Sequence, residues 1–182
     1  GNGLGKLLKE ARENAQRGTA TVFGYYVDDP ERFGVVEFDE KMNAVSIEEK
    51  PKEPKSNYCV TGLYFYDNTV CEKAEKIKPS ARGELEITDL NLLFLKEKKL
   101  SVKLLGRGFA WLDTGTVETL NEAANFVRIV EGRQSVMISA PEEIAFKNGW
   151  ISRQILLLCA EKYGKSPYGA HLRQVADGKL KY

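Results

Sequence analysis

The sequence predicts an α/β fold that continues into an α-helical C-terminal appendage. Residues 1–116 mix strand-like and helix-like segments, whereas residues 117–182 carry only helical patterns. The strand-like segments are short and rich in β-branched and aromatic residues, which favours a sheet; they span residues 21–27, 34–39, 44–48, 58–66 and 100–105. We therefore expect a mixed sheet flanked by helices in the first part and a helical region in the second.

The segment 58–66 carries the strongest strand pattern, because it is apolar almost throughout. A continuous apolar run is typical of a strand that is covered on both faces, so we expect it inside the sheet. Residues 50–55, just before it, place prolines among charged side chains, and proline cannot join the interior of a sheet. That stretch is predicted to be a loop.

Helical patterns lie between these strands. Residues 4–15 place apolar side chains at helical spacing, and Gly18 follows as a C-terminal stop. A short helix is expected over residues 68–77. Thr88 is expected to cap the N-terminus of the next helix, whose apolar side comes from the leucines of residues 90–95.

The appendage is predicted to hold a long helix and three shorter ones. The long helix covers residues 117–130, with Gly132 just beyond its end. The shorter ones are expected to begin at Pro141, after the cap Ser152 and after the cap Ser166.

Charge and cysteine content exclude some functional classes. The 27 basic and 26 acidic residues leave a net charge of +1, which gives no general attraction to nucleic acid or to an anionic membrane. No apolar run approaches the length of a membrane span. Cys59, Cys71 and Cys159 are too scattered for a metal or redox motif, which indicates reduced thiols and a cytoplasmic protein.

Two polar segments could carry chemistry near the sheet. Glu49 and Lys50 end a predicted strand, where they are either a solvated turn or a pair that binds sugar hydroxyls and a phosphate. Arg82 lies in a loop beside Gly83, ahead of a helix. It could bind a phosphate bidentately, or it could simply pair with a nearby glutamate on the surface.

Asp113 is the third candidate, because it follows a strand-like stretch and precedes a helix. Ligands bind at that edge in open α/β sheets, and a lone carboxylate there suits Mg²⁺. The alternative is that Asp113 and Thr116 cap the following helix. His171, the only histidine, falls in a segment of ordinary polarity, so a solvated or capping role is expected rather than catalysis.

Taken together, these polar segments and the sequence around them resemble the glucose-1-phosphate thymidylyltransferases. The matching strings run in order along almost the whole chain; they are residues 29–38, 48–51, 54–58, 61–67, 79–89, 111–116 and 141–145. The resemblance implies a partial nucleotidyltransferase-type mixed sheet in residues 1–116, which hold the sugar-phosphate-binding half of that domain, and an oligomerisation and regulatory region in residues 117–182. It also implies homo-oligomers, with glucose 1-phosphate and nucleotide-sugar as ligands.

The family's reaction joins glucose 1-phosphate to the α-phosphorus of dTTP and releases pyrophosphate. By the resemblance, the site residues are Gly34 and Glu49 for the sugar hydroxyls, Lys50 and Arg82 for the sugar phosphate, Val60, Tyr64 and Trp111 for the pocket wall, and Asp113 for Mg²⁺. The family also binds nucleotide effectors in a second site, which Arg107, Glu143 and Ile144 match. Lys147 stands where the family often has arginine.

One departure from the family pattern is large. Family members carry a G-G-x-G-T-R loop that cradles the triphosphate and a G-D-N aspartate that binds a second Mg²⁺, and neither string occurs in these 182 residues. We therefore expect a C-terminal portion of such an enzyme that is catalytically silent alone. The alternatives are a module that binds a sugar phosphate or an effector without chemistry, or an oligomerising half that complements a separate N-terminal half.

Overall fold

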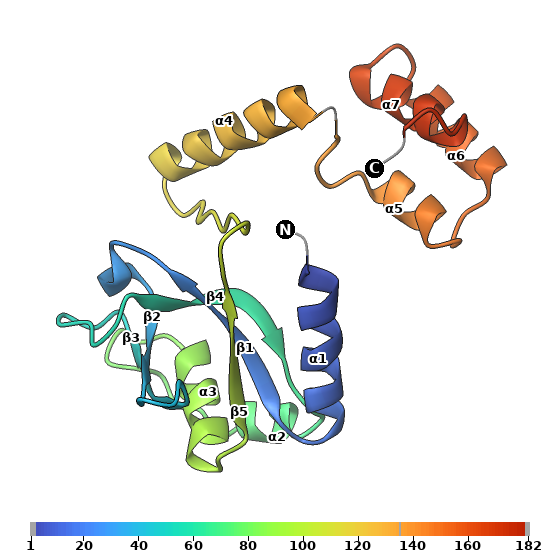
Figure 1. Ribbon diagram of the computed structural model, residues 1–182. Coiled ribbons are helices and arrows are strands. Elements are labelled where there is room, and N and C mark those ends of the chain that lie inside the picture. The colour runs from blue at the N-terminus through green and yellow to red at the C-terminus, as the bar shows by residue number, and fades with distance from the viewer. Residues whose placement is uncertain (1–2, 135, 181–182) are drawn as a thin grey trace. The chain divides into compact units, whose positions relative to one another are not determined.

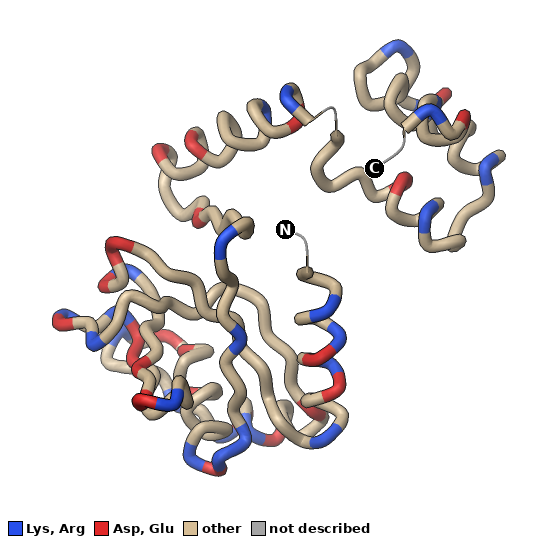
Figure 2. Tube along the Cα trace, in the orientation of Figure 1, with Lys and Arg blue, Asp and Glu red and all other residues tan. Residues whose placement is uncertain are grey.

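The computed structural model describes residues 3–134 and 136–180 and divides into two compact units. One unit ends at Trp111 and the other begins at Leu112. Figure 2 shows acidic and basic residues interspersed along both units. In the part of the chain that the structure describes, no helix is long and apolar enough to span a bilayer.

The first unit is built on a mixed sheet (Figure 1), which confirms the predicted α/β class. Its strands are β1 (Ala20–Tyr26), β2 (Gly34–Phe38), β3 (Ala44–Glu49), β4 (Tyr58–Phe65) and β5 (Leu100–Leu105), in the spatial order β3-β2-β4-β1-β5. Among the strands of the described residues, only the pairing of β1 with β5 is parallel. The helical elements are α1 (Leu4–Gln16), the short 3₁₀ turn η1 (Pro30–Arg32), α2 (Val70–Ala74) and α3 (Ile87–Lys96).

Two helices cover opposite faces of β1. Asn14 of α1 donates a hydrogen bond to the Thr21 hydroxyl over 3.2 Å, whereas Ala20 packs against Leu90 and Phe94 of α3. Because neighbouring residues of a strand point to opposite faces, α1 and α3 lie on different sides of the sheet. The strand buried on both faces is therefore β1.

The prediction of double burial for residues 58–66 was wrong. Strand β4 does lie in the middle of the sheet, but within it only Cys59 and Thr61 are buried. The helices pack on β1 rather than along the whole of β4, which leaves the alternate side chains of β4 half-covered. These half-covered positions are available to form the wall of a site.

The second unit is helical, as predicted. It contains α4 (Val117–Gln134), α5 (Pro141–Lys147), α6 (Arg153–Lys162) and α7 (Pro167–Ala176). Helix α4 runs through Gly132 rather than ending before it, because a glycine in ordinary helical backbone only weakens a helix and does not stop it. The hydroxyl of Thr116 accepts the Thr119 N–H at the start of α4.

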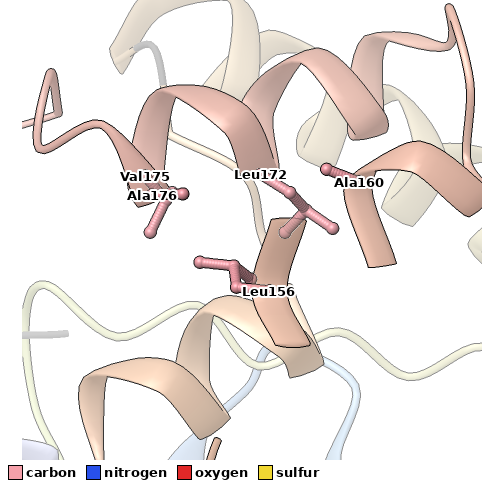
Figure 3. Close-up of a cluster of buried hydrophobic side chains, with 5 residues drawn as sticks. All are labelled: Leu156, Ala160, Leu172, Val175 and Ala176. Carbon is pink, nitrogen blue, oxygen red and sulfur yellow. The ribbon is translucent and has the colours of Figure 1, made fainter. Parts of the chain in front are cut away.

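Helices α6 and α7 share the core of this unit. Figure 3 shows its buried side chains, which are Leu156, Ala160, Leu172, Val175 and Ala176. Both helices begin as predicted, with Ser152 accepting the Ile155 N–H and Ser166 accepting the Gly169 N–H.

Candidate sugar-phosphate site

The paired ends of β2 and β3 bring two of the predicted site residues together. Gly34 begins β2, Glu49 ends β3, and the antiparallel register places them opposite each other. Lys50 follows Glu49 with φ of 44°, in the left-handed region, and its N–H donates to the Phe33 carbonyl over 2.9 Å. The backbone at Glu49 and Lys50 is thus held at the end of the strand.

The first turn of α3 also reaches this point. The Thr88 hydroxyl donates to the Oε2 atom of Glu49 over 2.5 Å, and only 3% of Thr88 is exposed. The prediction that Thr88 caps this helix was wrong, since Glu86 occupies the N-cap position and provides no side-chain cap. The Thr88 hydroxyl therefore donates to the carboxylate of Glu49 and does not cap the helix backbone.

Arg82 approaches Glu49 from the loop before α3. Its Nη1 atom lies 3.8 Å from Glu49 Oε1, while its other nitrogens contact Glu84 and Glu86. The interpretation that Arg82 pairs with nearby glutamates is therefore confirmed, and its binding of a phosphate stays a prediction. Ser80 shapes this loop by accepting the Arg82 N–H over 3.2 Å and donating to Glu86 over 2.9 Å.

An aromatic pair stands near the carboxylate. Burial, together with the negative charge of Glu49, raises the pKa of Tyr64 above its ordinary value. The Tyr64 ring stacks on Tyr66 at a centroid distance of 6.0 Å, and the Tyr66 hydroxyl donates to Asn91 Oδ1 over 2.7 Å. Sequence reasoning did not identify Tyr66, Asn91 or the contact of Thr88, since they act through partners distant in the chain.

Trp111 contacts the residue just before β2, and Val60 lies on β4, the strand that pairs with β2. The Trp111 ring meets Phe33 edge-on at 5.1 Å between centroids and contacts Tyr25 at 5.9 Å. Phe33 is the residue before Gly34, so this aromatic contact is next to the site in the chain. Val60 follows Cys59, which pairs with Val35 of β2.

Asp113 belongs to the second unit, in an irregular segment between β5 and α4. The expectation that it follows a strand was wrong, because β5 ends at Leu105. Its carboxylate accepts the Gly115 N–H over 3.4 Å. Within residues 3–134 and 136–180 no cluster of three or more His, Cys, Asp and Glu side chains could hold a metal alone, and the assignment of Asp113 to Mg²⁺ stays a prediction.

The predicted effector residues divide between the two units. Arg107 is exposed after β5 and lines a surface cavity with Tyr25, Tyr26 and Tyr58. Glu143 and Ile144 lie on α5 in the second unit. Their grouping with Arg107 in one site remains a prediction.

Glu143 is buried in the helical unit, where it joins α5 to α7. One carboxylate oxygen lies 2.6 Å from His171 Nε2 and the other 2.6 Å from Lys147 Nζ. His171 is only 8% exposed, so the expectation of a solvated histidine was wrong. The carboxylate of Glu143 explains its burial, since a buried polar ring needs a hydrogen-bonding partner.

The fold matches one class of protein. Residues 1–129 match the family model described as nucleotidyl transferase, and the chain belongs to that family. Within it, the chain is homologous to glucose-1-phosphate thymidylyltransferases. It is 56% identical over 172 residues to the enzyme of Neisseria gonorrhoeae and 51% identical over 176 residues to that of Xanthomonas campestris.

These relatives are longer than the chain. The matches cover 94% and 97% of this chain but 59% of each relative. Among solved structures, one similar fold is that of a Bacillus anthracis protein assigned as a glucose-1-phosphate thymidylyltransferase, in complex with a sucrose. The two structures align with a TM-score of 0.59 at 44% identity, and the alignment covers 68% of this chain and 48% of that one. A UDP-glucose pyrophosphorylase complexed with UDP-glucose gives 0.58 at 23% identity over 66% of this chain and 47% of its own, which shows the shared fold alone.

Proposed function

We propose that these residues form the sugar-phosphate side of a nucleotidyltransferase active site that acts on glucose 1-phosphate. The observation that carries the proposal is the meeting of Gly34, Glu49 and Arg82 at the paired ends of β2 and β3. A phosphorylated hexose requires a cation for its phosphate and an acceptor for its hydroxyls, and these groups supply both. The names of the relatives support the same substrate.

The proposed reaction is nucleotidyl transfer. A phosphate oxygen of glucose 1-phosphate forms a bond to the α-phosphorus of dTTP, the bond between the α-phosphorus and the bridging oxygen breaks, and pyrophosphate leaves with dTDP-glucose formed. Lys50 and Arg82 hold and orient the attacking phosphate, and the Gly34 backbone and Glu49 hold the sugar. Such catalysis consists largely of positioning and charge neutralisation.

The remaining predicted residues have supporting roles in this proposal. Val60, Tyr64 and Trp111 form the wall against the sugar, and Asp113 supplies an oxygen ligand to Mg²⁺. When bound, that ion would neutralise charge on the phosphates. Arg107, Glu143 and Ile144 would contact a nucleotide effector.

For the 182 residues taken alone, we propose ligand binding without turnover. The chain contains no G-G-x-G-T-R string for a triphosphate, although it carries the groups for a sugar phosphate. We also propose that copies of the chain associate. Helix α4 supports this, because Ala123 is its only buried residue among those described while Leu120, Phe126 and Ile129 are exposed.

Titration of the 182-residue chain with glucose 1-phosphate tests the function. We expect saturable binding by calorimetry, and Arg82→Ala should weaken it about 10-fold or more, as expected for a charge-assisted contact worth about 1.5–3 kcal/mol. Lys9→Ala removes an exposed cation from α1 and should leave binding unchanged. Absence of binding at millimolar glucose 1-phosphate would contradict the substrate assignment. Turnover with dTTP and Mg²⁺ would contradict the proposal that these 182 residues have no catalytic activity by themselves.

A further inference from the structure

The two carboxylate oxygens of Glu49 have different surroundings. Oε2 accepts the Thr88 hydroxyl at 2.5 Å, whereas Oε1 lies 3.8 Å from Arg82 Nη1. The second distance exceeds hydrogen-bonding range, so Oε1 retains lone pairs for another donor. The Glu49 side chain is partly exposed, which leaves that oxygen open to a ligand.

The donor to Oε2 is held rigidly. Thr88 is buried in the first turn of α3, and its branched side chain restricts rotation about χ1. Helix α3 is itself fixed, because Leu90 and Phe94 pack in the core against Ala20 of β1. A hydroxyl on such an element can set the orientation of a partner more precisely than one on a loop.

The space around this hydrogen bond is tight. A Cβ atom at Gly34 would lie 3.1 Å from the Thr88 hydroxyl and 3.2 Å from Glu49 Oε2. The hydroxyl, the carboxylate and the Gly34 backbone therefore pack directly against one another. Little room remains for the carboxylate to adopt a different orientation while the hydroxyl is in place.

We propose that Thr88 is a positioning residue that orients the Glu49 carboxylate so that Oε1 accepts a hydrogen bond from a sugar hydroxyl. The inference rests on the proposed function, since it assigns a role toward the same sugar-phosphate ligand. Its consequence is selectivity, because a fixed acceptor favours a ligand that carries the hexose over inorganic phosphate. Thr88 contributes without touching the ligand.

The test compares Thr88→Val, which keeps the shape and removes the hydroxyl, with Thr88→Ser, which keeps the hydroxyl. Calorimetric or NMR titration gives the affinity of each variant for glucose 1-phosphate and for inorganic phosphate. We expect Thr88→Val to weaken glucose 1-phosphate binding about 10-fold, equivalent to about 1.4 kcal/mol, and to leave phosphate binding within about 2-fold. Thr88→Ser should stay close to the original chain in both titrations.

A double-mutant cycle separates positioning from general stability. In a Glu49→Ala background, Thr88→Val should cause no further loss of glucose 1-phosphate affinity, because the carboxylate that it orients is gone. Equal weakening toward both ligands, or a Thr88→Val variant that binds like the original chain, would overturn the positioning role. Failure of the original chain to bind glucose 1-phosphate would instead overturn the proposed function, so the two failures are distinguishable.

Discussion

At the scale of single residues, Gly34 allows two strands and a helix to meet without a side chain between them. Position 34 does not need glycine for its backbone conformation, since the positive φ angles of the described chain lie elsewhere. It needs glycine for space, because an added Cβ would press on both Thr88 and Glu49. Contacts of 3.1–3.2 Å would push these groups apart by a few tenths of an ångström.

We therefore expect Gly34→Ala to weaken glucose 1-phosphate binding by about 10-fold and to lower the free energy of unfolding by about 1–3 kcal/mol, as overpacking does. Titration and urea denaturation measure the two effects. Gly5→Ala is the matched control, because a Cβ at that position of α1 meets nothing within 4 Å. Unchanged affinity in Gly34→Ala would show that the tight packing around Glu49 is irrelevant to the ligand.

Some residues of the cluster around Glu49 could be predicted from the sequence, and others could not. Glu49 and Arg82 were identifiable because they stand in motifs beside a strand end and a glycine. The role of Thr88 was missed, since a threonine shortly before an apolar run is also the usual pattern of a helix cap. Its partner lies 39 residues away in the chain, and a local pattern cannot reveal such a contact.

At the scale of elements, the predicted strands and most of the helix starts were confirmed, whereas burial and helix ends were less predictable. Strand β1, not β4, is covered on both faces, because which strand lies under both helices depends on topology rather than on apolar content. Helix α4 continues through Gly132 because nothing there requires a left-handed residue. By contrast, Gly164, which follows α6, has φ of 60°, in the left-handed region that favours glycine.

The packing of α6 on α7 gives the element-scale prediction. A Cβ at Gly169 of α7 would lie 2.9 Å from the carbonyl oxygens of Ala160 and Gly164, which are backbone atoms that cannot rotate away. Arg173 of α7 donates to the same two carbonyls, over 3.2 and 3.0 Å, and so caps the C-terminal end of α6. One close helix contact therefore serves both packing and capping.

We expect Gly169→Ala to destabilise the chain by about 1–3 kcal/mol in thermal or urea unfolding, because the helices must separate. Gly132→Ala makes the same chemical change inside α4, where a Cβ meets nothing within 4 Å, and should stabilise by up to about 1 kcal/mol through helix propensity. Equal effects of the two changes would contradict the close approach of α7 to α6.

At the scale of the whole molecule, the two units hold different parts of the proposed machinery. The proposed sugar-phosphate cluster (Gly34, Glu49, Lys50, Arg82 and Thr88) lies entirely in the unit that ends at Trp111, whereas Asp113, Glu143 and Ile144 lie in the other. The resemblance placed Asp113 with the sugar-phosphate residues and Glu143 and Ile144 in a separate effector site, whereas the contacts that the structure describes join Gly34, Glu49 and Arg82 within the first unit. The helical unit has its own core, and there Glu143 contributes a buried link between α5 and α7.

Helix α4 gives the prediction at this scale, because its exposed apolar residues are costly in water unless something covers them. Phe126 is 41% and Ile129 55% exposed. If copies of the chain associate through α4, the chain should sediment as a dimer or larger species at tens of micromolar, and a Phe126→Glu, Ile129→Glu variant should sediment as a monomer with its helical content retained. A Met42→Glu, Val45→Glu variant is the control, since it places the same two charges on comparably exposed apolar residues of the first unit, at the turn between β2 and β3 and at the start of β3. A monomeric original chain, or a control that dissociates it equally well, would show that α4 is not the contact surface.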